Sequence, residues 1–139
     1  MAIEVRGVCT LLQVFDMPKS LHFYRDVLGF EVVNTSNPRA GDRVDWCHLR
    51  LDTSEVMLNT AYEGPERPLT PESSRVAAHA DPCLYFGCPD VDGAYGYLRA
   101  KGVDVKEPTI AHYGMKQLYV TDPDGYLLCF QWQAEAPAQ

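Results

Sequence analysis

The chain has 139 residues, of which 46% are hydrophobic and 22% charged, a composition typical of a soluble globular protein with one real core. No apolar run reaches the roughly 20 residues of a membrane span, and the amino terminus lacks the apolar segment of a signal peptide, so we expect a cytoplasmic protein that binds no membrane. The formal net charge is -7 without any Lys/Arg cluster, which disfavours nucleic acid and favours neutral or cationic partners.

The first half of the chain predicts a strand, a helix and three further strands. In residues 11–33, "LLQVFDMPKSLHFYRDVLGFEVV", a strand passes through a Pro/Asp turn into a helix, which ends at Gly29 as its C-terminal cap and leads into a short strand, "FEVV". Then "WCHLRLD" and "EVMLNTA" predict a hairpin with its turn at Thr53 and Ser54. The helix is indicated by apolar residues at helical spacing, namely Leu21, Tyr24 and Leu28.

The second half repeats this pattern. Residues 84–106 again predict a strand, a helix with Tyr95 and Leu98 on its apolar side, a cap at Gly102 and a short strand, "VDVK". The offset of 73 between the two capping glycines also places Tyr24 on Tyr97. "MKQLYVT" and "YLLCFQW" then predict a hairpin around the turn "DPDG".

The predicted fold class is therefore α+β, with two βαβββ modules at residues 7–62 and 81–132. Residues 63–80 carry three prolines and five charged residues, which indicates an exposed linker or flexible flap. We expect the two modules and this linker to form one domain.

Two stretches, "SLHFYRDVLGFEV" at residues 20–32 and "YVTDPDGYLLCF" at residues 119–130, resemble signatures of the vicinal oxygen chelate superfamily. This superfamily includes glyoxalases, bleomycin resistance proteins and extradiol dioxygenases, and the resemblance runs from about residue 7 to residue 132. It implies that the sheets form a half-open barrel around a cup, usually completed in a homodimer. The fold alone does not fix what happens in the cup.

In metal-dependent members, one side chain from the first and one from the last strand of each module bind the metal, and these side chains are His, Gln or Glu. Carried over by position, the resemblance places Cys9, Cys83 and Cys129 at three of these positions and Asn59 at the fourth. None of the four is a histidine or carboxylate, and in this respect the chain most resembles the metal-less bleomycin resistance branch of the superfamily.

The three cysteines allow two interpretations. They pack as small apolar residues, the interpretation that we favour, or they converge as a soft site for zinc, copper(I) or another thiophilic metal. The five cysteines form no CxxC pair, which disfavours a disulfide framework or a zinc knuckle.

Without a metal, the cup becomes a ligand pocket. Every second residue along a strand points to the same face, so the residues two positions from the cysteines are expected to line it. For Trp46, packing in the core or in a dimer is the stronger alternative, whereas for Tyr113 both roles stay open. His48 and His79 are expected to be solvated or hydrogen-bonded rather than to bind a metal. The predicted pocket comprises Cys9, Leu11, Gln13, Trp46, Asn59, Cys83, Tyr85, His112, Tyr113, Leu127, Cys129 and Gln131.

The function that we predict is metal-independent binding or sequestration of a small cationic or aromatic molecule, by a homodimer without a cofactor. The alternatives are a metal-dependent lyase, isomerase or dioxygenase of the same superfamily, or a cysteine-based soft-metal site with zinc or a similar ion.

Overall fold

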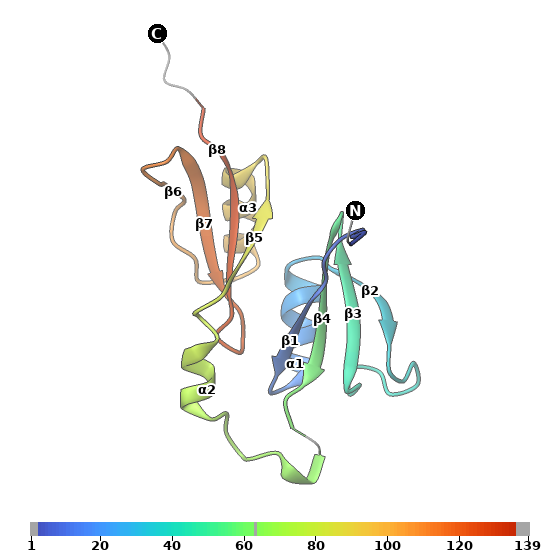
Figure 1. Ribbon diagram of the computed structural model, residues 1–139. Helices are drawn as coiled ribbons and strands as arrows, with labels where there is room; N and C mark the ends of the chain where they lie inside the picture. The colour runs from blue at the N-terminus through green and yellow to red at the C-terminus, as the bar shows by residue number, and fades with distance from the viewer. Residues whose placement is uncertain (1–2, 63, 136–139) are drawn as a thin grey trace. The chain divides into compact units, whose positions relative to one another are not determined.

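The structure is a computed structural model that describes residues 3–62 and 64–135, so residue 63 of the predicted linker lies outside the described residues. The chain divides into two compact units, with the boundary between Pro71 and Glu72. Each unit contains one four-stranded sheet, as Figure 1 shows. None of the described helices has the length and hydrophobicity required to traverse a lipid bilayer.

The first module builds its sheet in the order β1-β4-β3-β2. Its first and last strands, β1 and β4, are parallel, whereas the other neighbours are antiparallel. A helix connects β1 to β2; it begins as α1 and continues directly as a π-helical segment, η1. The elements are β1 (Thr10–Val14), α1 (Met17–Leu21), η1 (His22–Val27), β2 (Glu31–Thr35), β3 (Trp46–Leu51) and β4 (Ser54–Thr60).

The second module repeats this topology in the order β5-β8-β7-β6, with β5 parallel to β8. Its helix, α3, is a regular α-helix. The connection between the modules contains a 3-10 turn, η2 (Gly64–Glu66), and a short helix, α2 (Ser73–Ala78). The remaining elements are β5 (Cys83–Gly87), α3 (Val91–Ala100), β6 (Thr109–Ile110), β7 (Met115–Thr121) and β8 (Leu127–Gln133).

Both connecting helices begin and end with the same signals. The Asp16 carboxylate accepts a hydrogen bond from the Lys19 amide at 3.1 Å, and the Asp90 carboxylate accepts one from the Gly93 amide at 2.9 Å. Each helix is followed by a glycine with positive φ, +93° at Gly29 and, in the second module, +82°. The predicted C-terminal caps are thus confirmed.

Alternation along the strands gives each sheet one face that packs against its helix. In the first module this face carries the buried Leu12, Leu49 and Leu58, which form a core with Leu21 and Tyr24 of the helix. In the second module it carries Phe86, Leu118, Leu128 and Phe130, with Leu98 of α3. The opposite face of each sheet is free of its own module's helix, and we call these two surfaces the first and second open faces.

The π-helical segment accommodates one extra residue in the first helix. Gly29 follows its N-cap, Asp16, by 13 positions, whereas the equivalent glycine follows Asp90 by 12. A π-bulge is the usual way to insert a residue while both helix ends keep their places. The predicted equivalence of Tyr24 and Tyr97 is wrong for this reason: Tyr24 is fully buried, like Leu98, whereas Tyr97 is 45% exposed.

Two other details of the prediction are corrected. The strand expected at residues 103–106 does not form; Val105 is buried there, and pairing with β7 starts only at β6, beyond Pro108, which has no amide hydrogen to donate. The turn of the first hairpin lies one residue earlier than expected, because Asp52 adopts a φ of 52° and β4 begins at Ser54.

The end of the predicted linker is fixed to the second module. The His79 Nδ1 donates a hydrogen bond to the Asp124 carbonyl at 2.7 Å, and its ring stacks on that of Tyr126 with centroids 4.0 Å apart. Helix α2 precedes this contact, and the Val76 carbonyl lies at the turn glycine, Gly125. His79 is therefore hydrogen-bonded, one of the two states expected for it.

This contact predicts that Gly125→Ala destabilises the protein. Gly125 has a φ of +90°, and an added Cβ would lie 2.9 Å from the Val76 carbonyl oxygen. We expect a loss of about 1–3 kcal/mol in the free energy of unfolding, measured by urea denaturation.

The matched control is Gly96→Ala in α3, where an added Cβ meets nothing within 4 Å. This variant is expected to gain about 0.5–1 kcal/mol, since alanine favours the helix. Equal stability of the two variants would contradict a strained turn at Gly125.

Candidate functional site

The second open face gathers polar and aromatic side chains from three neighbouring strands. Strand pairing places Tyr85 beside Cys129, and Cys129 beside Tyr119, so these three side chains form one row. In the adjacent row, Gln131 lies beside Gln117. A further row contains Cys83, Leu127 and Thr121.

Gln117 is the centre of a hydrogen-bond network on this face. Its Nε2 donates to the Tyr113 hydroxyl at 2.7 Å and to the Gln131 Oε1 at 3.0 Å. Its Oε1 accepts from the Tyr119 hydroxyl at 3.2 Å, and the Tyr85 hydroxyl lies 3.5 Å from that of Tyr119. The buried Gln117 amide therefore fixes the orientation of its neighbours, whose outer hydroxyl and amide groups can meet a ligand.

The network is uncharged. The hydrogen bond with Tyr85, and then burial, raise the pKa of Tyr119 above its usual range, so its phenol stays protonated at neutral pH.

A cavity of about 310 Å³ lies at the β6 side of this network. It is lined by Thr109, Gln117, Tyr119 and Thr121 of the sheet and by residues 104–107.

The cysteines of this face are protonated thiols. Cys129 is fully buried and Cys83 half-buried. Burial, and then the proximity of Cys83, raise the pKa of Cys129, and burial raises the pKa of Cys83. Since a metal binds the thiolate, a metal ion at this place would have to displace both protons.

The first open face is organised in similar rows. The Asn59 Nδ2 donates to the Gln13 Oε1 at 3.2 Å, and Trp46 lies beside Asn59 on β3. The next row contains Leu11, Met57 and His48. An amide pair flanked by an aromatic ring thus occurs on this face too.

A histidine–carboxylate pair lies at the edge of these rows. The His48 Nε2 is 3.1 Å from the Glu55 Oε1, but the two are not aligned as a hydrogen bond, and this buried nitrogen has no hydrogen-bond partner among the described residues. Burial, and then the negative charge of Glu55, raise the pKa of the Cys9 thiol. Sequence reasoning missed this pair, although His48 and Glu55 are on facing strands of the predicted hairpin.

Strand register changes one of the four positions carried over from the resemblance. Leu11 pairs with Met57 in the first module, and the equivalent pair in the second module is Tyr85 with Cys129. Met57, not Asn59, is therefore the counterpart of Cys129, two residues away on the same face. Asn59 corresponds to Gln131.

These positions do not suit the divalent metal of the metal-dependent members. They hold three thiols of raised pKa and a thioether in place of the His, Gln or Glu ligands of those members; a hard ion needs oxygen ligands, and thiolates select softer ions such as copper(I) or zinc. Within the described parts of the chain, no three His, Cys, Asp or Glu side chains come together as a possible metal site.

The predicted pocket residues divide between the two faces. Tyr113 belongs to the Gln117 network. His112 lies beside it in the turn before β7, and the two rings pack edge to face with their centroids 5.0 Å apart. That the two faces line one pocket stays a prediction. Sequence reasoning missed Gln117 and Tyr119, which the alternation of "MKQLYVT" places on the face of Cys129.

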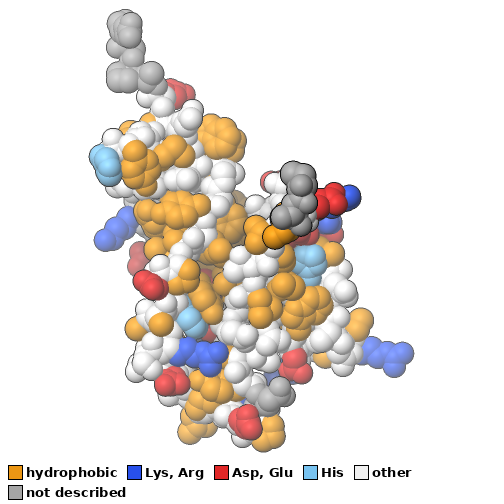
Figure 2. Space-filling view, viewed as in Figure 1, with side chains coloured by type: hydrophobic (Ala, Val, Ile, Leu, Met, Phe, Trp, Pro, Cys, Tyr) orange, Lys and Arg blue, Asp and Glu red, His pale blue; other side chains and the backbone are white. Residues whose placement is uncertain are grey.

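Charge on the surface is mixed. Within each unit, the Lys and Arg side chains of the described residues that Figure 2 shows lie apart rather than gathered in one basic patch. This agrees with the acidic net charge of -7.

Comparison with known proteins gives a consistent picture. The model of the Glyoxalase/Bleomycin resistance protein/Dioxygenase superfamily matches residues 8–130. Curated proteins give no match.

Solved structures share the fold at low sequence identity. TioX from Micromonospora sp. ML1 is 18% identical with a TM-score of 0.70, and the match covers 93% of this chain and 99% of TioX. TnmS3, described as an antibiotic binding protein from Streptomyces sp. CB03234, is 22% identical with a TM-score of 0.67 and coverage of 96% and 99%. A glyoxalase/bleomycin resistance protein from the same Streptomyces strain is 20% identical, with a TM-score of 0.62 and coverage of 89% and 97%.

The raised thiol pKa values predict slow alkylation. At about pH 7.5, we expect iodoacetamide to modify Cys83 and Cys129 at least about tenfold more slowly in the folded protein than in urea, because only the thiolate reacts. Raising the pH should accelerate the reaction of the folded protein. Mass spectrometry of the peptides measures each site, and equal rates in the folded and unfolded chain at Cys129 would contradict a protonated, buried thiol.

Proposed function

Because the chain belongs to the glyoxalase/bleomycin resistance protein/dioxygenase superfamily, we propose that it binds and sequesters a small molecule on its open faces without a metal ion. The observation that carries this proposal is the uncharged network around Gln117 on the second open face. Such a network offers fixed donors and acceptors to a ligand but no metal-activated nucleophile.

The side chains of both faces favour a planar ligand with polar substituents. Tyr85 and Tyr113 are 52% and 58% exposed, so their rings can stack on a ligand while their hydroxyls bind its carbonyl or hydroxyl groups. On the first face, Trp46 and the Gln13–Asn59 pair offer the same combination. The net charge of -7 adds a long-range attraction for a cationic ligand.

Structural neighbours support this class of function. TnmS3 is described as an antibiotic binding protein, and another neighbour as a glyoxalase/bleomycin resistance protein. Their identity to this chain, 22% and 20%, supports a shared fold and leaves the ligand to experiment. We also propose that the protein is cytoplasmic and forms a homodimer; native mass spectrometry tests the homodimer.

The proposal predicts that Gln117→Leu weakens ligand binding. We expect bleomycin, or a planar aromatic antibiotic from a panel, to bind saturably in isothermal titration calorimetry. Gln117→Leu should reduce the affinity about tenfold or more, since it leaves several polar groups without their shared partner.

Gln133→Leu is the matched control, because Gln133 is exposed at the end of β8 and its side chain has no partner among the described residues. Its affinity should stay within about twofold of the parent. A panel without any saturable ligand, or equal losses in both variants, would contradict binding at the network.

A soft-metal site is the second candidate, favoured by the proximity of Cys83 and Cys129 on adjacent strands. Two thiols beside each other can hold copper(I) or zinc once they lose their protons. The enzymatic alternatives of the superfamily need hard or borderline ligands that the equivalent positions lack, so we propose no reaction step.

Metal analysis separates these candidates. For protein purified without chelator or affinity metal, we expect elemental analysis to find well below one equivalent of zinc or copper per chain, because the thiols are protonated. About one equivalent that is lost in Cys129→Ser would favour the soft-metal site instead. Cys88→Ser is the control, since Cys88 follows β5 beyond the thiol pair.

A further inference from the structure

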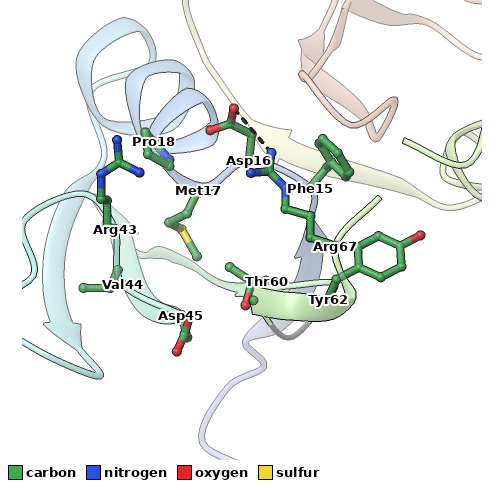
Figure 3. Close-up of a pocket in the computed structure, with 11 residues that line it drawn as sticks. Phe15, Asp16, Met17, Pro18, Arg43, Val44, Asp45, Thr60, Tyr62 and Arg67 are labelled. Atoms are coloured by element: carbon green, nitrogen blue, oxygen red, sulfur yellow. Dashed lines mark ion pairs between the residues drawn. The ribbon is translucent and has the colours of Figure 1, made fainter. Parts of the chain in front are cut away.

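A second cavity, of about 430 Å³, lies at the end of the first module, where β1 and β4 both end (Figure 3). No residue of the first open face's rows lines it. Its wall combines charged, aromatic and apolar side chains from the helix start, the segment before β3 and the chain after β4. The lining residues are Phe15, Asp16, Met17, Pro18, Arg43, Val44, Asp45, Thr60, Tyr62, Gly64 and Arg67.

One side of the cavity is aromatic. The Arg67 guanidinium lies 4.2 Å from the centroid of the Phe15 ring, and the Tyr62 ring meets Phe15 edge to face at 6.2 Å. Arg67 is also 3.7 Å from the Asp16 Oδ2, which is too long for a hydrogen bond. The other Asp16 oxygen caps the helix at Lys19, so Asp16 is already engaged.

The other side carries two opposite charges without partners. Arg43 and Asp45 are exposed on either side of the buried Val44. Neither side chain has a hydrogen bond or ion pair with any residue that the structure describes. Figure 3 shows these residues on one side and Phe15, Tyr62 and Arg67 on the other, with Met17 and Thr60 between them.

The equivalent corner of the second module provides an internal comparison. A cavity of about 360 Å³ lies there between the start of α3 and the end of β8. Two of its acidic side chains have partners: Lys116 Nζ is 2.5 Å from the Asp92 carboxylate, and the Asp90 carboxylate caps Gly93. The third, Glu135, has no ion pair with a residue that the structure describes. Among the described residues, no cation without a partner lines this second cavity, so the combination of an unpaired Arg43 and an unpaired Asp45 is particular to the first module.

We propose that the cavity of the first module binds a zwitterionic amino acid with a planar side chain. The carboxylate pairs with Arg43, the ammonium group pairs with Asp45, and the ring packs against Phe15 and Tyr62. A ligand with only one of these charges would leave the opposite protein charge without a partner, so both are needed for full affinity. A volume of about 430 Å³ accommodates one such molecule.

Calorimetric titration of the full chain with L-phenylalanine tests this site. We expect saturable binding of one molecule per chain. 3-Phenylpropionate, which lacks the ammonium group, and 2-phenylethylamine, which lacks the carboxylate, should each bind at least about tenfold more weakly. Absence of saturation by L-phenylalanine, or equal affinity of either analogue, would overturn the proposal.

Variants place the binding in this cavity. Arg43→Gln and Asp45→Asn should each reduce the affinity for L-phenylalanine about tenfold or more, and both are exposed substitutions that should leave the urea midpoint unchanged. Arg39→Gln, in the same loop but outside the lining, is the matched control and should bind like the parent. An equal loss in Arg39→Gln would overturn the assignment.

The inference is independent of the function proposed for the open faces. Gln117→Leu should leave phenylalanine binding unchanged, since Gln117 belongs to the second module. A loss in that variant would place the ligand on the network instead and would overturn a separate site.

Discussion

The parallel pairing of the first and last strand in each module is the constraint on which the rest of the structure depends. It joins β1 to β4 and β5 to β8, although some 45 residues lie between the partners. A parallel pair needs a crossover, and the helix of each module supplies part of it while covering one face of the sheet. On the opposite face, this register decides which side chains of the first strand become neighbours of those on the last, such as Tyr85 beside Cys129.

Much of this arrangement could be predicted from local pattern. The strands β3, β4, β7 and β8 and both capping glycines were expected within one residue, since alternation and glycine at positive φ are local signals. The π-helical insertion was not visible, because one extra residue does not disturb a helical hydrophobic pattern enough to be noticed. The late start of β6 was not visible from the sequence either, because the burial of Val105 outweighs the β propensity of the segment.

The candidate site was predicted only in part, for a different physical reason. Strand alternation predicted which residues of β8 share a face with Cys129. The polar network on that face, however, depends on Gln117 of the neighbouring strand, whose hydrogen-bond partners come from three segments. Asn59 was predicted as the counterpart of Cys129, two residues beyond the true counterpart, Met57, for the same reason: a parallel register is set by packing rather than by the sequence of either strand. The charges of Arg43 and Asp45 gave no signal at all, because a lack of partners is a property of the folded chain.

Each sheet takes all four of its strands from one module, and each module caps its own helix. Among the residues that the structure describes, no backbone ladder crosses the boundary between Pro71 and Glu72. If two copies exchanged modules, every strand pairing described above would therefore be kept, and the exchange would change only which chain carries each half. The proline-rich segment before α2 would then decide, by its length and stiffness, between a closed single chain and an interlocked pair.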